Sequence, residues 1–215
     1  LLNRLKARFP LLKQIVSIPT EDGFEVQPQA NIFPKWFYCP RCKRFMNYND
    51  WKNHWQDKNN FNIQCFNPEC KGEHLEQVRF VMTCDNGHIQ DLPWNFWNNR
   101  KPIDETRENA ASEEENSPKI VLKYEKCCEE QQLIYEISNE NTDLSGIRIK
   151  CKKCGKSESL KGIFNFRQKC SGQKYWLGLQ NGLFVKEECD EKSTVKIKSS
   201  NSIYYANNLN SLWIP

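Results

Sequence analysis

The sequence has 215 residues, eleven of them cysteine, with 38% hydrophobic and 12% aromatic residues and a formal net charge of +4. Its length fits one large domain or two small ones. No run approaches the ~18 apolar residues that span a bilayer, and the N-terminus lacks the order of a signal peptide, which argues against a membrane or exported protein and predicts a cytoplasmic one.

The net charge alone does not point to a partner. Four thiolates around one zinc ion add a net charge of about −2, so two such sites would bring the formal charge close to zero. Only local clusters of charge can therefore indicate a nucleic-acid partner.

The cysteines indicate metal binding and not disulfides. Their number is odd, and the pair C-x2-C occurs twice, at Cys39/Cys42 and Cys151/Cys154. Two thiolates from one tight turn can bind the same ion, whereas a disulfide framework has no reason to repeat that interval. We therefore expect an α+β protein in which small antiparallel β segments and short helices are organised around zinc knuckles or ribbons.

Residues 1–32 are expected to form an N-terminal helical segment and a connector. Apolar residues recur at helical spacing in residues 1–16, interrupted by Pro10, which predicts two short helical pieces. Residues 17–32 contain Pro and Gly and are predicted to be extended. The chain starts at Leu1 without Met and ends on an apolar run, so we expect a piece of a longer protein.

Residues 33–100 are expected to form the first zinc module. Its four predicted ligands are two pairs with 22 residues between them: Cys39, Cys42, Cys65 and Cys70. In the polar insert that separates the pairs, Asp50 could cap a short helix that carries Trp51 and Trp55.

A strand predicted over residues 77–83 runs into a C-x3-H pair, and Asp91 is expected to open a short helix that carries Trp94 and Trp97. Four residues could complete a third metal site: Cys84, His88, Cys127 and Cys128. The alternative is a structural histidine in a turn, with the cysteine before it a buried small hydrophobe. Because consecutive side chains diverge, we expect at most one of the two adjacent cysteines to bind.

The rest of the chain is expected to divide into an acidic loop, 101–118, and a β-rich second zinc module, 119–215. The loop is almost without apolar residues, so we expect it to be solvated. Apolar or alternating runs predict strands over 120–124, 133–137, 147–149, 195–197 and 203–205. The second set of zinc ligands consists of a C-x2-C pair and the two single cysteines that follow: Cys151, Cys154, Cys170 and Cys189. Two zinc ions are thus expected, with a third where the C-x3-H pair binds.

No catalytic residue is predicted. Gly155-Lys156-Ser157 imitates the end of a phosphate-binding loop but lacks the glycine five residues earlier, and neither H-E-x-x-H nor H-x-E occurs. Four thiolates leave a zinc ion no open position for a substrate. We therefore expect structural metals, no enzyme activity and no small-molecule substrate.

Two long motifs are Phe33-Pro-Lys-Trp-Phe-Tyr-Cys-Pro-Arg-Cys42 and Val78-Arg-Phe-Val-Met-Thr-Cys-Asp-Asn-Gly-His-Ile-Gln-Asp-Leu-Pro-Trp94, and shorter ones follow in order up to Ser211-Leu-Trp-Ile-Pro215. Over about residues 33–215 they resemble the core of the DrmB family of DISARM, a bacterial anti-phage defence system. The chain departs from that pattern at Leu92, where an aromatic is expected, and in the insert 47–60. The resemblance implies a zinc-containing subunit that partners a helicase-type, DrmA-like ATPase and helps it to engage foreign DNA, or the C-terminal domain of a large defence helicase.

Basic side chains on the two knuckles could contact DNA phosphates, with Trp36 available for stacking. The candidates are Arg41, Lys43, Arg44, Lys150, Lys152, Lys153 and Lys156. The alternative is that these charges only solvate the knuckles. A second hypothesis is a protein-interaction scaffold without DNA contact, anchored by the rings at positions 36, 37, 51, 55, 94 and 97, although for Trp94 and Trp97 we favour a place in the core.

Overall fold

The computed structural model describes Lys6 and residues 31–55, 63–99, 102–104, 120–122, 125–138, 141, 143–180, 183–201 and 203. The chain divides into two compact units, Leu1–Asn31 with Tyr204–Pro215, and Ile32–Ile203. Apart from Lys6, the two helical pieces expected within residues 1–16 lie outside the described residues, as does most of the connector 17–32. The following concerns the unit Ile32–Ile203.

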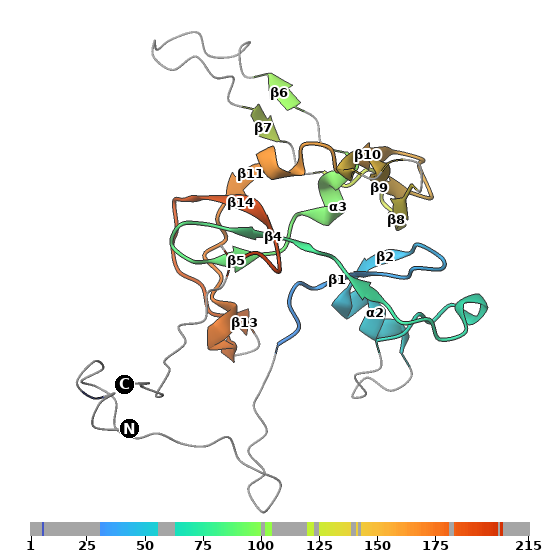
Figure 1. Ribbon diagram of the computed structural model, residues 1–215, viewed down its shortest axis with the longest axis horizontal. Coiled ribbons are helices and arrows are strands. Elements are labelled where there is room, and N and C mark those ends of the chain that lie inside the picture. Colours follow the sequence, from blue (N-terminus) through green and yellow to red (C-terminus); the bar gives the residue numbers. More distant parts are fainter. Residues whose placement is uncertain are drawn as a thin grey trace, which may run out of the picture. The chain divides into compact units, whose positions relative to one another are not determined.

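Small antiparallel sheets and a few short helices make up this unit, which confirms the expected α+β class (Figure 1). One sheet has the order β2-β1-β3, formed by Phe45–Asn47, Trp36–Tyr38 and Glu76–Gln77. A second has the order β10-β9-β8, formed by Ser157–Ser159, Ile147–Cys151 and Leu133–Ile137. The third has the order β11-β14-β4-β5, formed by Arg167–Lys169, Lys192–Ile197, Phe80–Thr83 and Ile89–Gln90. Two hairpins pair β6 (Pro102–Asp104) with β7 (Ile120–Leu122) and β12 (Leu179–Gln180) with β13 (Leu183–Phe184).

The β11-β14-β4-β5 sheet joins the two halves of the sequence. Strand β4 comes from the first predicted module and β14 from the second, and Val195 lies opposite Met82 in their ladder (Figure 1). Both of these side chains are buried. The two modules therefore belong to one compact unit.

The strand predicted over 77–83 is two strands, β3 and β4, which belong to different sheets. The break lies at Val78 and Arg79. The Val78 N–H donates to the Trp36 carbonyl at 3.0 Å, whereas the Arg79 carbonyl accepts from the Lys198 N–H at 2.7 Å. Within two residues, the backbone thus changes from pairing with β1 to pairing with β14. This passage connects the β2-β1-β3 sheet to the β11-β14-β4-β5 sheet.

Both predicted helices occur, but each begins elsewhere than expected. Helix α2 covers Tyr48–His54 and its N-cap is Asn47, whose side chain accepts from the Asn49 N–H, so Asp50 lies in the first turn and is not the cap. Helix α3 covers Trp94–Trp97 and follows Pro93. The Asp91 carboxylate accepts instead from the Lys35 N–H at 3.0 Å, which holds two distant segments together.

The strands predicted over 133–137 and 147–149 are confirmed as β8 and the start of β9, and the one over 195–197 as the end of β14. Residues 120–122 of the run 120–124 form β7. The loop 101–118 differs from the expectation at residues 102–104, which form β6, and its other residues lie outside those described. Ile203 lies in a turn, and the other two residues of the strand predicted over 203–205 lie outside the described part.

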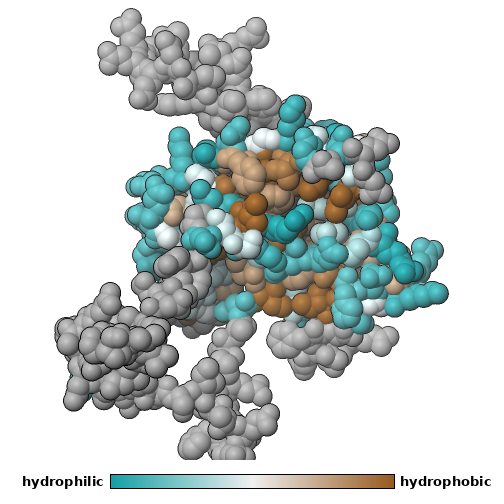
Figure 2. All heavy atoms as spheres, in the orientation of Figure 1, coloured by the Kyte–Doolittle hydropathy of each residue, from teal (hydrophilic) through white to brown (hydrophobic). Residues whose placement is uncertain are grey.

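One hydrophobic core connects the first knuckle, helix α3 and the β10-β9-β8 sheet. Phe45 connects these parts of the core, because its ring lies 5.5 Å from that of Trp94 and 5.4 Å from that of Tyr135. Trp94 and Trp97 are fully buried, which confirms their expected place in the core. On the face shown in Figure 2, polar side chains surround a group of apolar ones. No helix in the part of the chain described here is long and apolar enough to cross a membrane.

Candidate metal centres

Three groups of four side chains each gather ligand atoms within 4.8 Å of one another. Group 1 consists of Cys39, Cys42, Cys65 and Cys70. Group 2 consists of Cys84, His88, Cys170 and Cys189. Group 3 consists of Cys127, Cys128, Cys151 and Cys154. Together they take up all eleven cysteines, and each could hold one metal ion.

Group 1 joins two local turns, as the sequence predicts. The first turn follows β1 and is closed by the Lys43 N–H, which donates to the Cys39 carbonyl at 2.9 Å, while Lys43 adopts a left-handed φ of 62°. The second turn ends the short 3-10 helix η1 (Pro68–Cys70). The Sγ atoms of Cys39 and Cys70 lie 3.7 Å apart, and so do those of Cys42 and Cys65.

Group 2 lies at one end of the β11-β14-β4-β5 sheet. Cys84 follows β4, Cys170 follows β11, and Cys189 precedes β14. Because β14 runs antiparallel to both of its neighbours, these three positions meet at the same edge. The Cys84 Sγ lies 3.6 Å from that of Cys170 and 3.3 Å from the His88 Nδ1.

A carboxylate holds the histidine of group 2. The His88 Nε2 lies 2.6 Å from a Glu187 carboxylate oxygen, which leaves Nδ1 facing the sulfur atoms. Lys174 forms an ion pair with the same carboxylate and, together with His88, keeps the pKa of Glu187 below its usual range despite the opposing effect of burial. A carboxylate on the far nitrogen fixes the tautomer and orientation of a metal-binding histidine.

Group 3 brings the loop that carries Cys127 and Cys128 to the turn of the Cys151/Cys154 pair. The Cys128 Sγ lies 3.9 Å from that of Cys127 and 3.7 Å from that of Cys151. Side-chain amides of Asn98 and Gln131 donate to the Cys127 Sγ at 3.2 and 3.3 Å. These bonds turn the first cysteine toward the group, so the expectation that only one of the adjacent cysteines takes part is wrong.

The second ligand set predicted from the sequence is also wrong as a set. Cys151 and Cys154 do not share a group with Cys170 and Cys189. The latter two join the C-x3-H pair, because the pairing of β14 with β4 and β11 carries them there. All eight predicted ligands and all four candidates for a third site thus lie in groups that could hold a metal ion, but the partition differs.

Sulfur–sulfur distances in the groups fit a shared tetrahedral ion. The Sγ–Sγ separations given above lie between 3.6 and 3.9 Å. Two sulfurs bonded at about 2.3 Å to one tetrahedral ion lie about 3.8 Å apart, whereas disulfide sulfurs lie about 2.05 Å apart. The cysteines are free thiols in this structure.

The ionisation of the thiols also favours a cation in groups 2 and 3. Burial raises the pKa of Cys84 to about 11 and that of Cys128 to about 12. Burial acts in the same direction on Cys151, but backbone hydrogen bonds lower its pKa to about 6. For Cys189, burial acts to raise the pKa, but several hydrogen bonds, the strongest from the Asn86 side chain, together lower it to about 7. The negative charge of one thiolate therefore opposes the ionisation of the neighbouring thiol, and a divalent cation would offset that repulsion.

The sequence does not predict which residues contact the ligands. Glu187, Asn98 and Gln131 act on ligands from other segments or from loops without a motif. Their types are common at solvated positions, so no signal in the sequence marks them. Only the folded chain identifies these partners.

Of the seven basic residues predicted to bind nucleic acid, some already have partners. Arg41 pairs with Glu73 at 3.4 Å and Lys153 with Glu130 at 3.0 Å. The Lys156 ammonium donates to the Asn99 side chain at 2.7 Å.

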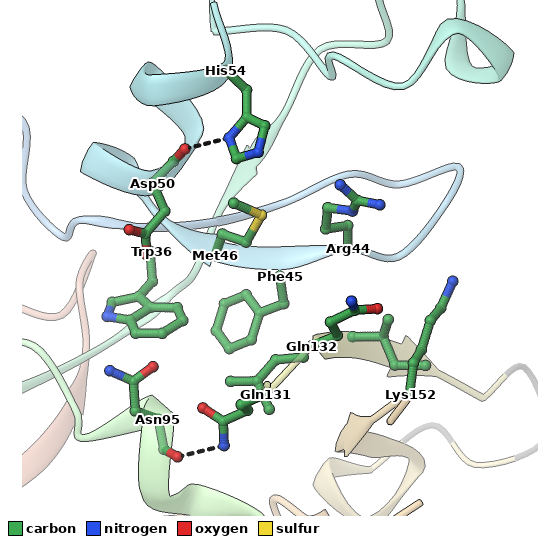
Figure 3. A pocket seen from close by; sticks show the side chains of 12 residues that line it. Trp36, Arg44, Phe45, Met46, Asp50, His54, Asn95, Gln131, Gln132 and Lys152 are labelled. Atoms are coloured by element: carbon green, nitrogen blue, oxygen red, sulfur yellow. Dashed lines mark hydrogen bonds between the residues drawn. The ribbon is translucent and has the colours of Figure 1, made fainter. Parts of the chain in front are cut away.

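Arg44 and Lys152, from different knuckles, line the same cavity (Figure 3). No acidic partner of these two, or of Lys43 and Lys150, occurs among the residues that the structure describes. One residue from each predicted basic cluster therefore lines that cavity, together with Asp50, whereas Lys43 lines a different cavity with Glu136.

The partition of the ligands can be tested by counting metal ions per chain in serine variants. Cys84→Ser/Cys170→Ser should lose one ion, because both residues belong to group 2, whereas Cys151→Ser/Cys170→Ser should lose two. Elemental analysis of the purified variants gives the count. If the second variant lost only one ion, the partition predicted from the sequence would be correct after all.

The role of Glu187 can be tested by a change that keeps the shape of the side chain. Glu187→Gln should weaken the hold on the ion in group 2 by roughly 10- to 100-fold, the usual effect of removing such a partner from a ligand histidine. Titration with a chromogenic chelator measures this, with Glu188→Gln, an exposed neighbour, as the matched control. Equal metal retention in both variants would contradict the assignment.

The chain matches the profile of a family described as a domain of unknown function (DUF8724) over residues 1–205. No curated protein shows significant similarity to the sequence. Since the match extends over most of its length, the chain belongs to the DUF8724 family.

Proposed function

We propose that the chain is a structural zinc-binding module that holds three zinc ions, one in each group. The observation that carries the proposal is that every cysteine and one buried histidine fall into three four-ligand sets. Soft thiolate and imidazole donors in fours are typical of structural zinc sites. The proposal therefore has three zinc sites, whereas the cysteine spacing predicts two and leaves a third open.

The proposed ions are structural and not catalytic. A hydrolytic zinc site keeps a position open for water or substrate, whereas each group here offers a complete set of four protein ligands. Most of the ligands are also buried. The proposal therefore assigns no enzyme activity to this chain.

For its biological role, we propose an accessory module that helps a helicase-type ATPase to engage nucleic acid, in a defence system of the DISARM kind. The resemblance of the motifs to the DrmB family supports the setting. Arg44 and Lys152, which line one cavity from two knuckles, support direct contact with nucleic acid. Rigid zinc knuckles suit such contacts because they present long cationic side chains from fixed turns.

A protein-docking scaffold is the second candidate, although its original basis has changed. Of the rings predicted to anchor an interface, those of Trp36, Phe37 and Trp51 are buried, as are those of Trp94 and Trp97. The observation that now favours docking is a different set of exposed apolar side chains: Trp176, Leu177 and Leu183. Such residues anchor interfaces when a partner covers them.

Zinc removal should unfold the module. Structural zinc contributes about 10–16 kcal/mol in zinc-finger peptides, comparable with the whole net stability of about 5–15 kcal/mol for a domain. We expect zinc in the purified chain, and a thermal transition that is lost on addition of a strong chelator and returns with added zinc. A melting curve that the chelator leaves unchanged would refute structural zinc.

Nucleic-acid binding should depend on salt. If four cations that lack acidic partners among the described residues contact phosphates, the affinity for a DNA duplex or strand should fall steeply between low and moderate salt, because each contact releases a counterion. A gel-shift series across salt concentrations measures this. Absence of binding to every form of DNA, together with copurification with a helicase-type ATPase in DNA-free conditions, would favour the docking scaffold.

A further inference from the structure

We propose that the cavity between the first and third metal groups binds one unpaired nucleotide of a single-stranded nucleic acid. This inference rests on the proposed nucleic-acid binding and adds the class of ligand. The cavity has a volume of about 370 Å³, near the lower end of the roughly 300–1,000 Å³ of small-ligand sites. That size suits a single nucleotide unit and excludes a base pair within a stacked duplex.

The cavity has two chemically different ends. Figure 3 shows the cationic side chains of Arg44 and Lys152 at one end, and Trp36 and Asn95 at the other. Between these ends, the half-buried Met46 lines the wall. A phosphate fits the cationic end and a base fits the end with rings and amides.

Segments that carry ligands of groups 1 and 3 support the two walls of the cavity. On one side, Phe66 follows a ligand of group 1, and its ring stacks on the His54 ring at 4.1 Å and supports the Arg44 guanidinium at 4.6 Å. Arg44 and His54 both line the cavity. The aromatic support orients the guanidinium plane, which can then stack on a base or bind a phosphate with its fixed fork.

On the other side, Lys152 lies between two ligands of group 3, and its N–H donates to the Gln132 carbonyl at 2.8 Å. The Gln132 N–H in turn donates to the Sγ of Cys151 at 3.5 Å. The side-chain amide of the neighbouring Gln131 donates to the Asn95 carbonyl at 2.7 Å and so links two residues that line the cavity. The site is therefore preorganised by two metal groups, which lowers the entropy that a ligand must lose on binding.

The polar groups of the cavity match the edge of a base. Amide groups of Asn95 and Gln132 can donate to and accept from a base, and the Asp50 carboxylate can accept from a base amino group. Duplex bases present these edges to their partners inside the stack, whereas an unpaired base can leave the stack and enter. Lys150 lies next to the cavity, opposite Ile134 in the ladder, where it can contact a neighbouring phosphate of the strand, whereas Lys43 lines a separate cavity.

The test compares three probes by fluorescence anisotropy with the zinc-loaded chain. They are an oligothymidine of about twenty nucleotides, longer than the ~4–16 nucleotides of common single-strand sites, an abasic strand of equal length, and a duplex of equal length. We expect the oligothymidine to bind about tenfold or more tightly than the other two, because only it offers unpaired bases. Equal affinity for the abasic strand would overturn the inference, since that strand keeps every phosphate.

A matched pair of double variants locates the site. Arg44→Gln/Lys152→Gln should weaken oligothymidine binding by about tenfold or more. Arg41→Gln/Lys153→Gln removes the same charge from side chains that are already paired with carboxylates, and it should change binding less than about threefold. Equal losses in both variants would overturn the assignment to the cavity. Zinc content and thermal unfolding verify that each variant is folded, and the abasic comparison decides the matter without any variant.

The outcomes separate this inference from the proposed function. If none of the three probes binds in a salt-dependent manner, nucleic-acid binding itself fails. If all three bind equally and with salt dependence, the proposed function stands and only the nucleotide site is refuted. Competition by a free thymidine nucleotide as strong as that by the oligothymidine would also refute the single-strand assignment, because it would show a site for a free small molecule.

Discussion

The structure depends on the convergence of sulfur atoms from segments far apart in the sequence. Within each group the sulfurs lie too far apart for a disulfide and at the spacing of a tetrahedral metal site. Thiols so close together repel one another once ionised, so the arrangement is suited to a bound cation. Without one, groups 1 and 2 would leave polar sulfurs and a buried histidine in the interior.

Group 2 has a special place because it closes the junction between the two halves of the chain. Its ligands stand at the edge where β4, β14 and β11 end or begin. An ion bound here would hold together the sheet that makes Ile32–Ile203 one unit. Groups 1 and 3, by contrast, shape the two knuckles whose side chains line the cavity. The proposed metal binding, the fold and the proposed recognition of a nucleotide thus depend on the same arrangement of residues.

The aromatic residues divide in the same way between structure and surface. Trp94, Trp97 and Phe45 pack the core between the knuckles and the sheets. Phe66 braces the cationic rim of the cavity, and Trp176 stays exposed beside group 2, with its ring 6.4 Å from that of His88. A high tryptophan content therefore has a structural cause here, since small sheets with few aliphatic residues need large rings to fill the space between them.

The sequence by itself determined group 1, the α+β class and the strands β8 and β9. These features depend on local patterns, such as two pairs of cysteines in tight turns and short apolar runs. Tertiary structure alone decided how the other eight ligands are divided, because Cys170 and Cys189 reach Cys84 only through the antiparallel pairing of β14 with strands on either side. It also decided that Arg44 and Lys152 share a cavity, since the bridge of Arg44 to Ile134 in β8 crosses ninety residues of sequence. Spacing along a chain records which side chains one turn can present together, but long-range strand pairing chooses the partners that meet them.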